Sequence, residues 1–119
     1  MIEVACWAHA RRYFYEARKT DAAGSTQGLA YIRLLYDVED EAKRQFASQT
    51  EGEEHRSLSA IRYALRQEFA VPRLASFKKW LESQRAECGG PVLPKSPMGQ
   101  AITYALNQWD ALCVYTTDG

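Results

Sequence analysis

The stretch Ser96–Cys113, SPMGQAITYALNQWDALC, carries the pattern that decides the fold. Most of its apolar residues recur at steps of three or four, which places them on one face of an α-helix. Ser96 followed by Pro97 is typical of a helix start, with the serine as cap and the proline at the first helical position. The stripe consists of Met98, Ile102, Ala105, Leu106, Trp109, Leu112 and Cys113. We therefore expect a buried helix at residues 98–117.

Similar periods occur upstream. A first helix is expected from Ala8 to about Gly24, with Trp7 and Phe14 packed inward. A second helix is expected at residues 27–47, with Ser25 or Thr26 as its cap. A third begins near Ser57 and reaches about residue 88; its expected buried face is Leu58, Ile61, Leu65 and Phe69. Pro72 should kink or restart it, because proline lacks an amide donor and crowds the preceding turn.

The N-terminus has a different period. Ile2, Val4 and Cys6 alternate with Glu3 and Ala5, which indicates a short strand at residues 1–7. One strand cannot form a sheet, so this segment is either a disordered leader or part of a sheet completed elsewhere. The expected fold class is mainly α, with one short N-terminal strand followed by four or five helices.

Length and composition indicate one globular domain: the chain has 119 residues, of which 46% are hydrophobic and 25% charged. It shows no apolar run near the roughly 20 residues needed to span a bilayer and no basic-then-apolar leader, so a cytoplasmic protein without a membrane partner is expected. Three cysteines, an odd number, argue against a disulfide framework.

Charge is balanced overall but unevenly distributed. Residues 37–54 are rich in acids, whereas residues 56–79 carry six basic residues and one acid, Glu68. A basic surface for phosphate contacts is one interpretation. We favour the other, a pair of helices with complementary charged faces.

The sequence contains no complete active site. Cys6 and His9 have the spacing of half a zinc site, but no second spaced pair follows, and no third group accompanies them as a nucleophile and base. Arg11 and Arg12, next to aromatic residues, could contact a nucleic-acid backbone. The residues alone favour the simpler alternative, in which these arginines are solvated or paired with Glu16.

Three long motifs carry a resemblance. CWAHARRYFYEA at residues 6–17, ALRQEFAVPRLASFKKWLESQ at 64–84 and LPKSPMGQAITYALNQWDAL at 93–112 occur in an order that closely resembles the insertion sequence 66 family of bacterial transposases. The resemblance implies a ribonuclease-H-like core in which three acidic residues hold two Mg²⁺ or Mn²⁺ ions. Cys6 and His9 match the family's Cys-x-x-His motif, which places them at the junction with that core.

The same resemblance implies where the catalytic acids lie. The first two aspartates are expected before Met1 and the third after Gly119, so the chain itself is expected to hold no catalytic residue, metal or other cofactor. We expect a single partial domain at residues 1–119: an orphan core strand (1–7), a helical insertion region (8–88), a Pro/Gly linker (89–97) and a return helix (98–117).

The expected function is therefore that of a truncated DNA transposase fragment, inactive alone, whose parent enzyme binds transposon ends. The alternative is a non-catalytic helical module that binds DNA or an intact transposase, and self-association is also possible. The candidate DNA-binding residues are Arg11, Arg12, Arg62 and Arg66.

Overall fold

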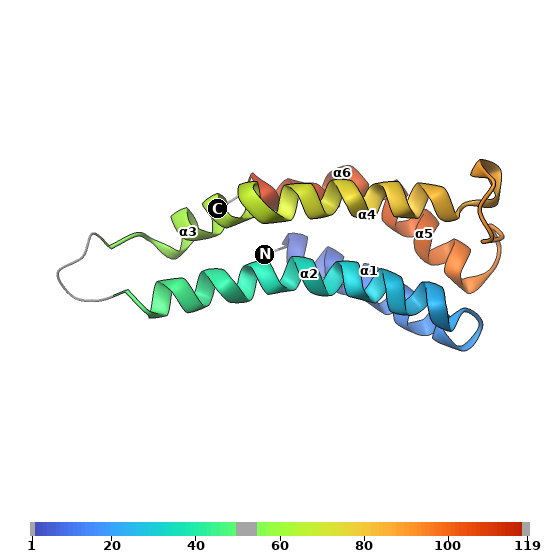
Figure 1. Ribbon diagram of the computed structural model, residues 1–119, viewed down its shortest axis with the longest axis horizontal. Coiled ribbons are helices and arrows are strands. Elements are labelled where there is room, and N and C mark those ends of the chain that lie inside the picture. The colour runs from blue at the N-terminus through green and yellow to red at the C-terminus, as the bar shows by residue number, and fades with distance from the viewer. Residues whose placement is uncertain (1, 50–54, 118–119) are drawn as a thin grey trace.

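The computed structural model describes residues 2–49 and 55–117, with side chains described from Trp7 onward in the first helix. Figure 1 shows an elongated helical assembly that measures 56 × 24 × 21 Å. The α-helices are α1 (Ile2–Glu16), α2 (Ala22–Ala47), α3 (Leu58–Leu65), α4 (Val71–Gln84), α5 (Pro97–Asn107) and α6 (Trp109–Cys113). A π turn at Arg66–Ala70 joins α3 to α4, and 3-10 turns occupy Ala17–Lys19, Ala86–Cys88 and Val114–Thr116.

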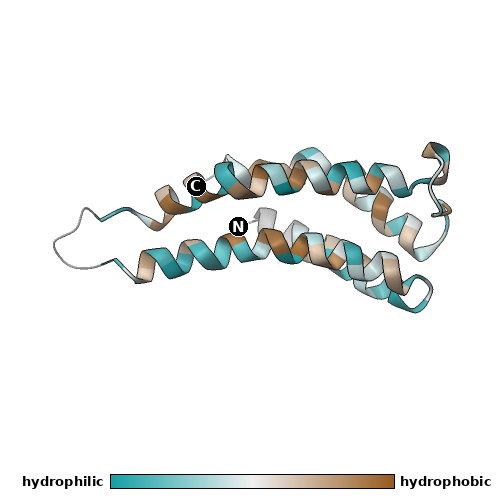
Figure 2. Cartoon of the chain, viewed as in Figure 1, coloured by the Kyte–Doolittle hydropathy of each residue, from teal (hydrophilic) through white to brown (hydrophobic). Residues whose placement is uncertain are grey.

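The helices are distributed unevenly along the long axis. At one end α1, α2, α4 and α5 pack together, whereas at the other end α3 packs mainly against α2 (Figure 1). Hydrophilic residues cover much of the C-terminal half of α2 (Figure 2). We call the part formed by α3 and the C-terminal half of α2 the α2–α3 hairpin.

The strand expected at residues 1–7 is not present. Residues 2–7 instead form the first turns of α1, and the described part of the chain contains an isolated bridge between Arg85 and Val92 but no strand. A helix satisfies its backbone hydrogen bonds within itself, whereas a strand needs a neighbouring strand. A helix therefore forms here despite the alternating pattern of Ile2, Val4 and Cys6.

The second helix begins five residues earlier than expected. Its cap is Asp21, whose carboxylate accepts a hydrogen bond from the Gly24 backbone N–H at 2.8 Å. Ser25 lies buried inside α2, where its hydroxyl donates to the Phe14 carbonyl at 2.7 Å. The capping role expected for Ser25 or Thr26 is thus performed by the aspartate, and Ser25 instead joins α2 to α1.

The π turn changes which residues of the third segment are buried. The third segment begins near Ser57 as expected; the Ser57 side chain caps α3, and Ile61 and Leu65 are buried. A π turn adds one residue to the helical repeat, so the next buried apolar residue is Ala70, five positions after Leu65. Phe69 is consequently 41% exposed, and the prediction that it is buried is wrong. Pro72 lies in the first turn of α4, just after the π turn. The first turn of a helix tolerates a residue that lacks an amide donor.

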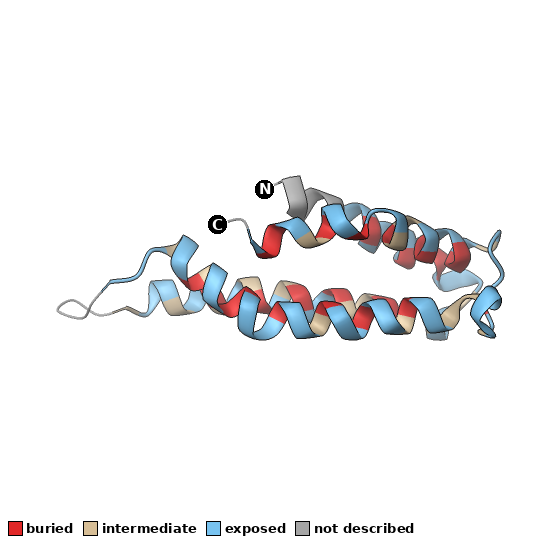
Figure 3. Ribbon diagram, turned by 90° about the horizontal axis from the view of Figure 1, so that it is seen from above, coloured by how far each residue is buried: buried red, intermediate tan, exposed pale blue. Residues whose placement is uncertain are grey.

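An aromatic cluster fills the core between α1, α4 and the C-terminal helices. Phe77 is fully buried at its centre, with ring centroids 5.0–6.3 Å from those of five neighbours: Trp7, Phe14, Tyr31, Trp80 and Trp109. Such pairs contribute beyond their buried area. Figure 3 shows buried residues along the facing sides of the helices.

The C-terminal stretch begins as expected. The Ser96 hydroxyl accepts from the Gly99 N–H at 3.0 Å, and Pro97 follows at the start of α5. The helix is interrupted at Gln108, so the expected single return helix is divided into α5, α6 and a final 3-10 turn. Most of the predicted stripe is buried, while Leu106 and Cys113 are half-buried. Among the described residues, no helix combines the length and apolar character needed to cross a bilayer.

Candidate nucleic-acid interface

Helix α1 separates a core face from an outer face. Trp7, Ala10 and Phe14 are buried, at helical steps of three and four. His9, Arg11, Arg12, Tyr13 and Glu16 are exposed. The core positions expected for Trp7 and Phe14 are confirmed, whereas His9 lies at the surface. Cys6 belongs to α1, but its side chain is outside the described residues.

The neighbouring arginines Arg11 and Arg12 line different grooves. Arg11 lines a groove of about 550 Å³ between α1 and α2, together with Ala8, Leu29, Arg33, Tyr36 and Asp40. Burial raises the pKa of the Tyr36 hydroxyl, and the positive charge of Arg11 partly opposes that shift. Arg33, which lines the same groove, is paired with exposed Asp37 at 3.2 Å.

Arg12 lines a second groove of about 410 Å³, between α1 and α5. Its other lining residues are His9, Tyr13, Glu16 and Tyr104. The rings of Tyr13 and Tyr104 are stacked, with centroids 4.7 Å apart and planes inclined by 26°. A cation and stacked aromatic rings therefore lie together in this groove.

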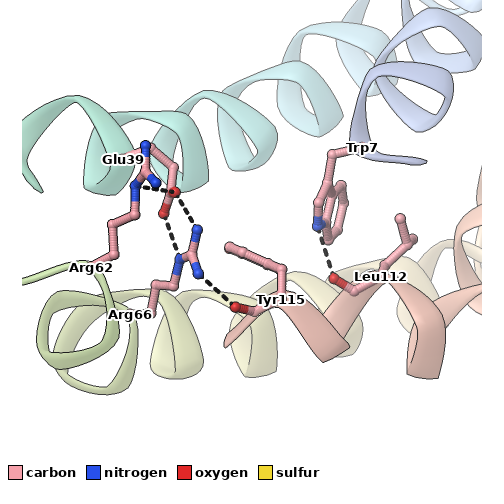
Figure 4. Close-up of polar contacts among 6 residues, drawn as sticks. All are labelled: Trp7, Glu39, Arg62, Arg66, Leu112 and Tyr115. Atoms are coloured by element: carbon pink, nitrogen blue, oxygen red, sulfur yellow. Dashed lines mark hydrogen bonds and ion pairs between the residues drawn. The ribbon is translucent and has the colours of Figure 1, made fainter. Parts of the chain in front are cut away.

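The other two candidate arginines lie in an interior ion-pair cluster (Figure 4). Arg66 donates from Nε and Nη2 to the two carboxylate oxygens of Glu39, at 3.0 and 2.6 Å. Its side chain is 2% exposed, and Nη1 donates to the Tyr115 carbonyl at 2.8 Å. The Nε atom of Arg62 lies 3.9 Å from a Glu39 oxygen. A phosphate cannot reach Arg66 unless this cluster opens.

The cluster supports the interpretation that the acidic and basic segments present complementary charged faces to each other. Glu39 comes from α2, Arg62 from α3 and Arg66 from the π turn, so the pairing joins the two segments. Bidentate arginine–carboxylate pairs are geometrically specific. The exposed surface of the basic segment retains Lys78 and Lys79.

A hydrogen bond that the sequence does not reveal connects the first and last helices. The Trp7 indole Nε1 donates to the Leu112 carbonyl at 3.0 Å across 105 positions of the chain (Figure 4). No local pattern signals a contact at that separation. No cluster of three or more histidine, cysteine or acidic side chains placed to hold a metal occurs at residues 7–49 or 55–117.

The sequence matches one known protein family over all 119 residues. The family profile described as "Transposase IS66 family" matches residues 1–119. The chain is 31% identical over 115 residues to "Uncharacterized protein y4qI" of Sinorhizobium fredii, a match that covers 96% of this chain. The chain spans 18% of that relative's length. No solved structure matches.

Proposed function

Because this chain belongs to the IS66 family of transposases, we propose that it is a helical, non-catalytic part of a DNA transposase that contacts DNA through α1. Its transposase-related function follows from the family. The DNA contact rests chiefly on one observation, the exposure of Arg11 and Arg12 on grooves at the two sides of α1. Guanidinium groups in such positions suit phosphates, which attract them whatever the base sequence.

We further propose that the chain is an insertion carried by a ribonuclease-H-like catalytic domain. The Trp7–Leu112 hydrogen bond holds α1 beside α6, and α1 also packs against α5. First and last helices that lie side by side suit a unit whose two ends join one host domain. In this proposal the catalytic acids and their metal ions belong to the host domain.

Binding to duplex DNA should depend on the two arginines in a salt-sensitive way. Each phosphate contact contributes about 0.9 to the slope of log affinity against log salt, so the Arg11→Ala/Arg12→Ala double variant is expected to lose about two units of slope. The matched control is Lys78→Ala/Lys79→Ala, which removes two exposed charges from α4. Fluorescence anisotropy of labelled duplex from 50 to 200 mM salt measures both slopes. Equal loss in the two variants, or no binding at any salt concentration, contradicts the proposed interface.

The chain alone should not cut or join DNA. Two-metal phosphodiester chemistry needs converging carboxylates, and the described residues present no such cluster. We expect labelled transposon-end DNA to stay intact after incubation with the chain and Mg²⁺ or Mn²⁺, as judged on a denaturing gel. Cleavage that disappears on addition of EDTA would refute the non-catalytic assignment.

A further inference from the structure

We propose that the groove between α1 and α5 binds an unpaired nucleobase of single-stranded DNA, stacked on the Tyr13–Tyr104 pair. This inference rests on the proposed function, because it assigns a separate task to one side of the same DNA-contacting helix. It adds a ligand class, a single-stranded segment, that phosphate contacts alone do not require.

The spacing of residues on α1 builds one wall of the groove. His9, Arg12, Tyr13 and Glu16 occupy positions i, i+3, i+4 and i+7 and therefore share one face of the helix. Tyr104 of α5 supplies the opposite wall. The volume of about 410 Å³ falls within the range of roughly 300–1,000 Å³ typical of small-ligand pockets.

The tyrosine pair offers a stacking surface for a base. Tyr13 is 40% exposed although its ring is stacked on Tyr104, which is half-buried. An exposed ring held in place by a partner loses little conformational freedom when a base stacks on it. Every base has an aromatic face, so stacking of this kind tolerates different sequences.

The charged residues of the groove match the remaining parts of a nucleotide. Arg12 can pair with the phosphate next to the base. Glu16 accepts hydrogen bonds and can receive them from an exocyclic amino group, which cytosine, adenine and guanine possess and thymine lacks. The groove therefore favours these three bases over thymine.

An unpaired base fits this site better than a duplex does. In a duplex both faces of each base are covered by its neighbours, so an aromatic pair on a helix surface can reach only the edges and the backbone. The guanidinium groups of Arg11 and Arg12 can contact backbone phosphates of either form, whereas the Tyr13 ring can stack only on an unpaired base. Stacking in the groove between α1 and α5 should thus require single-stranded DNA, whereas phosphate contacts should form with both single strands and duplex.

Tyr13→Ala is expected to weaken binding of single-stranded DNA about tenfold, since stacking of one base has an effect of this order. Binding of duplex should stay unchanged. Tyr13→Phe keeps the ring and should bind like the unchanged chain. Tyr63→Ala is the matched control, because Tyr63 is 49% exposed on α3, outside the groove. Anisotropy of labelled single strands and of the corresponding duplex measures all four proteins, and circular dichroism checks their folding.

Glu16→Gln provides a second measurement. Glutamine both donates and accepts, so the preference for oligo(dC) or oligo(dA) over oligo(dT) should disappear in this variant. Loss of binding to both DNA forms in Tyr13→Ala, or no loss to either, overturns the stacking site. Duplex binding without single-strand binding also overturns it, while leaving the proposed function intact. Absence of binding to both forms by the unchanged chain refutes both.

Discussion

Replacing Glu39 by glutamine is expected to lower the free energy of unfolding by about 3–5 kcal/mol, the range observed when one partner of a buried ion pair is removed. Arg66 is 2% exposed and directs two of its nitrogens at the Glu39 carboxylate. In the Glu39→Gln variant the charge of Arg66 stays buried without a counter-charge, and nearby Arg62 adds repulsion. The two side chains have nearly the same shape, so the loss is electrostatic. A loss of this size is a large part of the roughly 5–15 kcal/mol that stabilises a typical domain.

Asp40→Asn is the matched control for this substitution. It makes the same chemical change at the next position of α2, where the side chain is exposed. Urea unfolding followed by circular dichroism should show a large shift of the midpoint for Glu39→Gln and almost none for Asp40→Asn. Similar midpoints for the two variants would show that the cluster does not stabilise the fold.

Replacing Phe77 by alanine should destabilise the protein by about 3–5 kcal/mol, because it leaves a cavity as well as losing apolar burial. The ring is fully buried and contacts aromatic rings from α1, α2, α4 and α6. Few neighbours can collapse into the space, since most are large rings held by one another. Tryptophan fluorescence should report the change directly, because Trp7, Trp80 and Trp109 all lie against Phe77.

Phe69→Ala tests whether burial causes this loss. Phe69 is on the same continuous helical segment but is 41% exposed, with the Arg73 guanidinium 5.8 Å from its ring centroid. The same truncation there should cost less than about 1 kcal/mol, as surface substitutions usually do. Equal losses at the two positions would indicate that the π turn does not shift the buried face as described.

The helical core could be predicted because its signals are local. The Ser96–Pro97 start, the stripe from Met98 to Leu112 and the start of the third segment near Ser57 all follow from residues within a few positions of one another. The exposure of Phe69 could not be predicted in this way. It depends on one extra residue in the turn at Arg66–Ala70, and Pro72 predicts an irregularity there without giving its type.

The prediction of a strand at residues 1–7 is wrong for a different reason. Alternation describes which side chains share a face, but a strand also requires a partner for its backbone. In this chain Ile2–Trp7 continue as helix α1, whose later residues pack against α2 and α5. The described residues offer no strand with which this segment could pair, and no short window of sequence contains that information.

The candidate site could be predicted only in part. Arg11 and Arg12 are exposed, but their adjacency in the sequence gives no indication that they line two different grooves. The complementary charges of residues 37–54 and 56–79 predict that the two segments pair, but not that a single glutamate on α2 binds both Arg62 and Arg66. DNA contact by any of the four stays a prediction.

The Trp7–Leu112 hydrogen bond and the Glu39–Arg66 pair cross-link the molecule at two separate places. The first and last helices are joined near one place, whereas the hairpin extends along a body 56 Å long. The Glu39–Arg66 pair lies at the base of the hairpin and joins its two arms across 27 positions of the chain. The hairpin is therefore cross-linked at its base by a charged contact of its own.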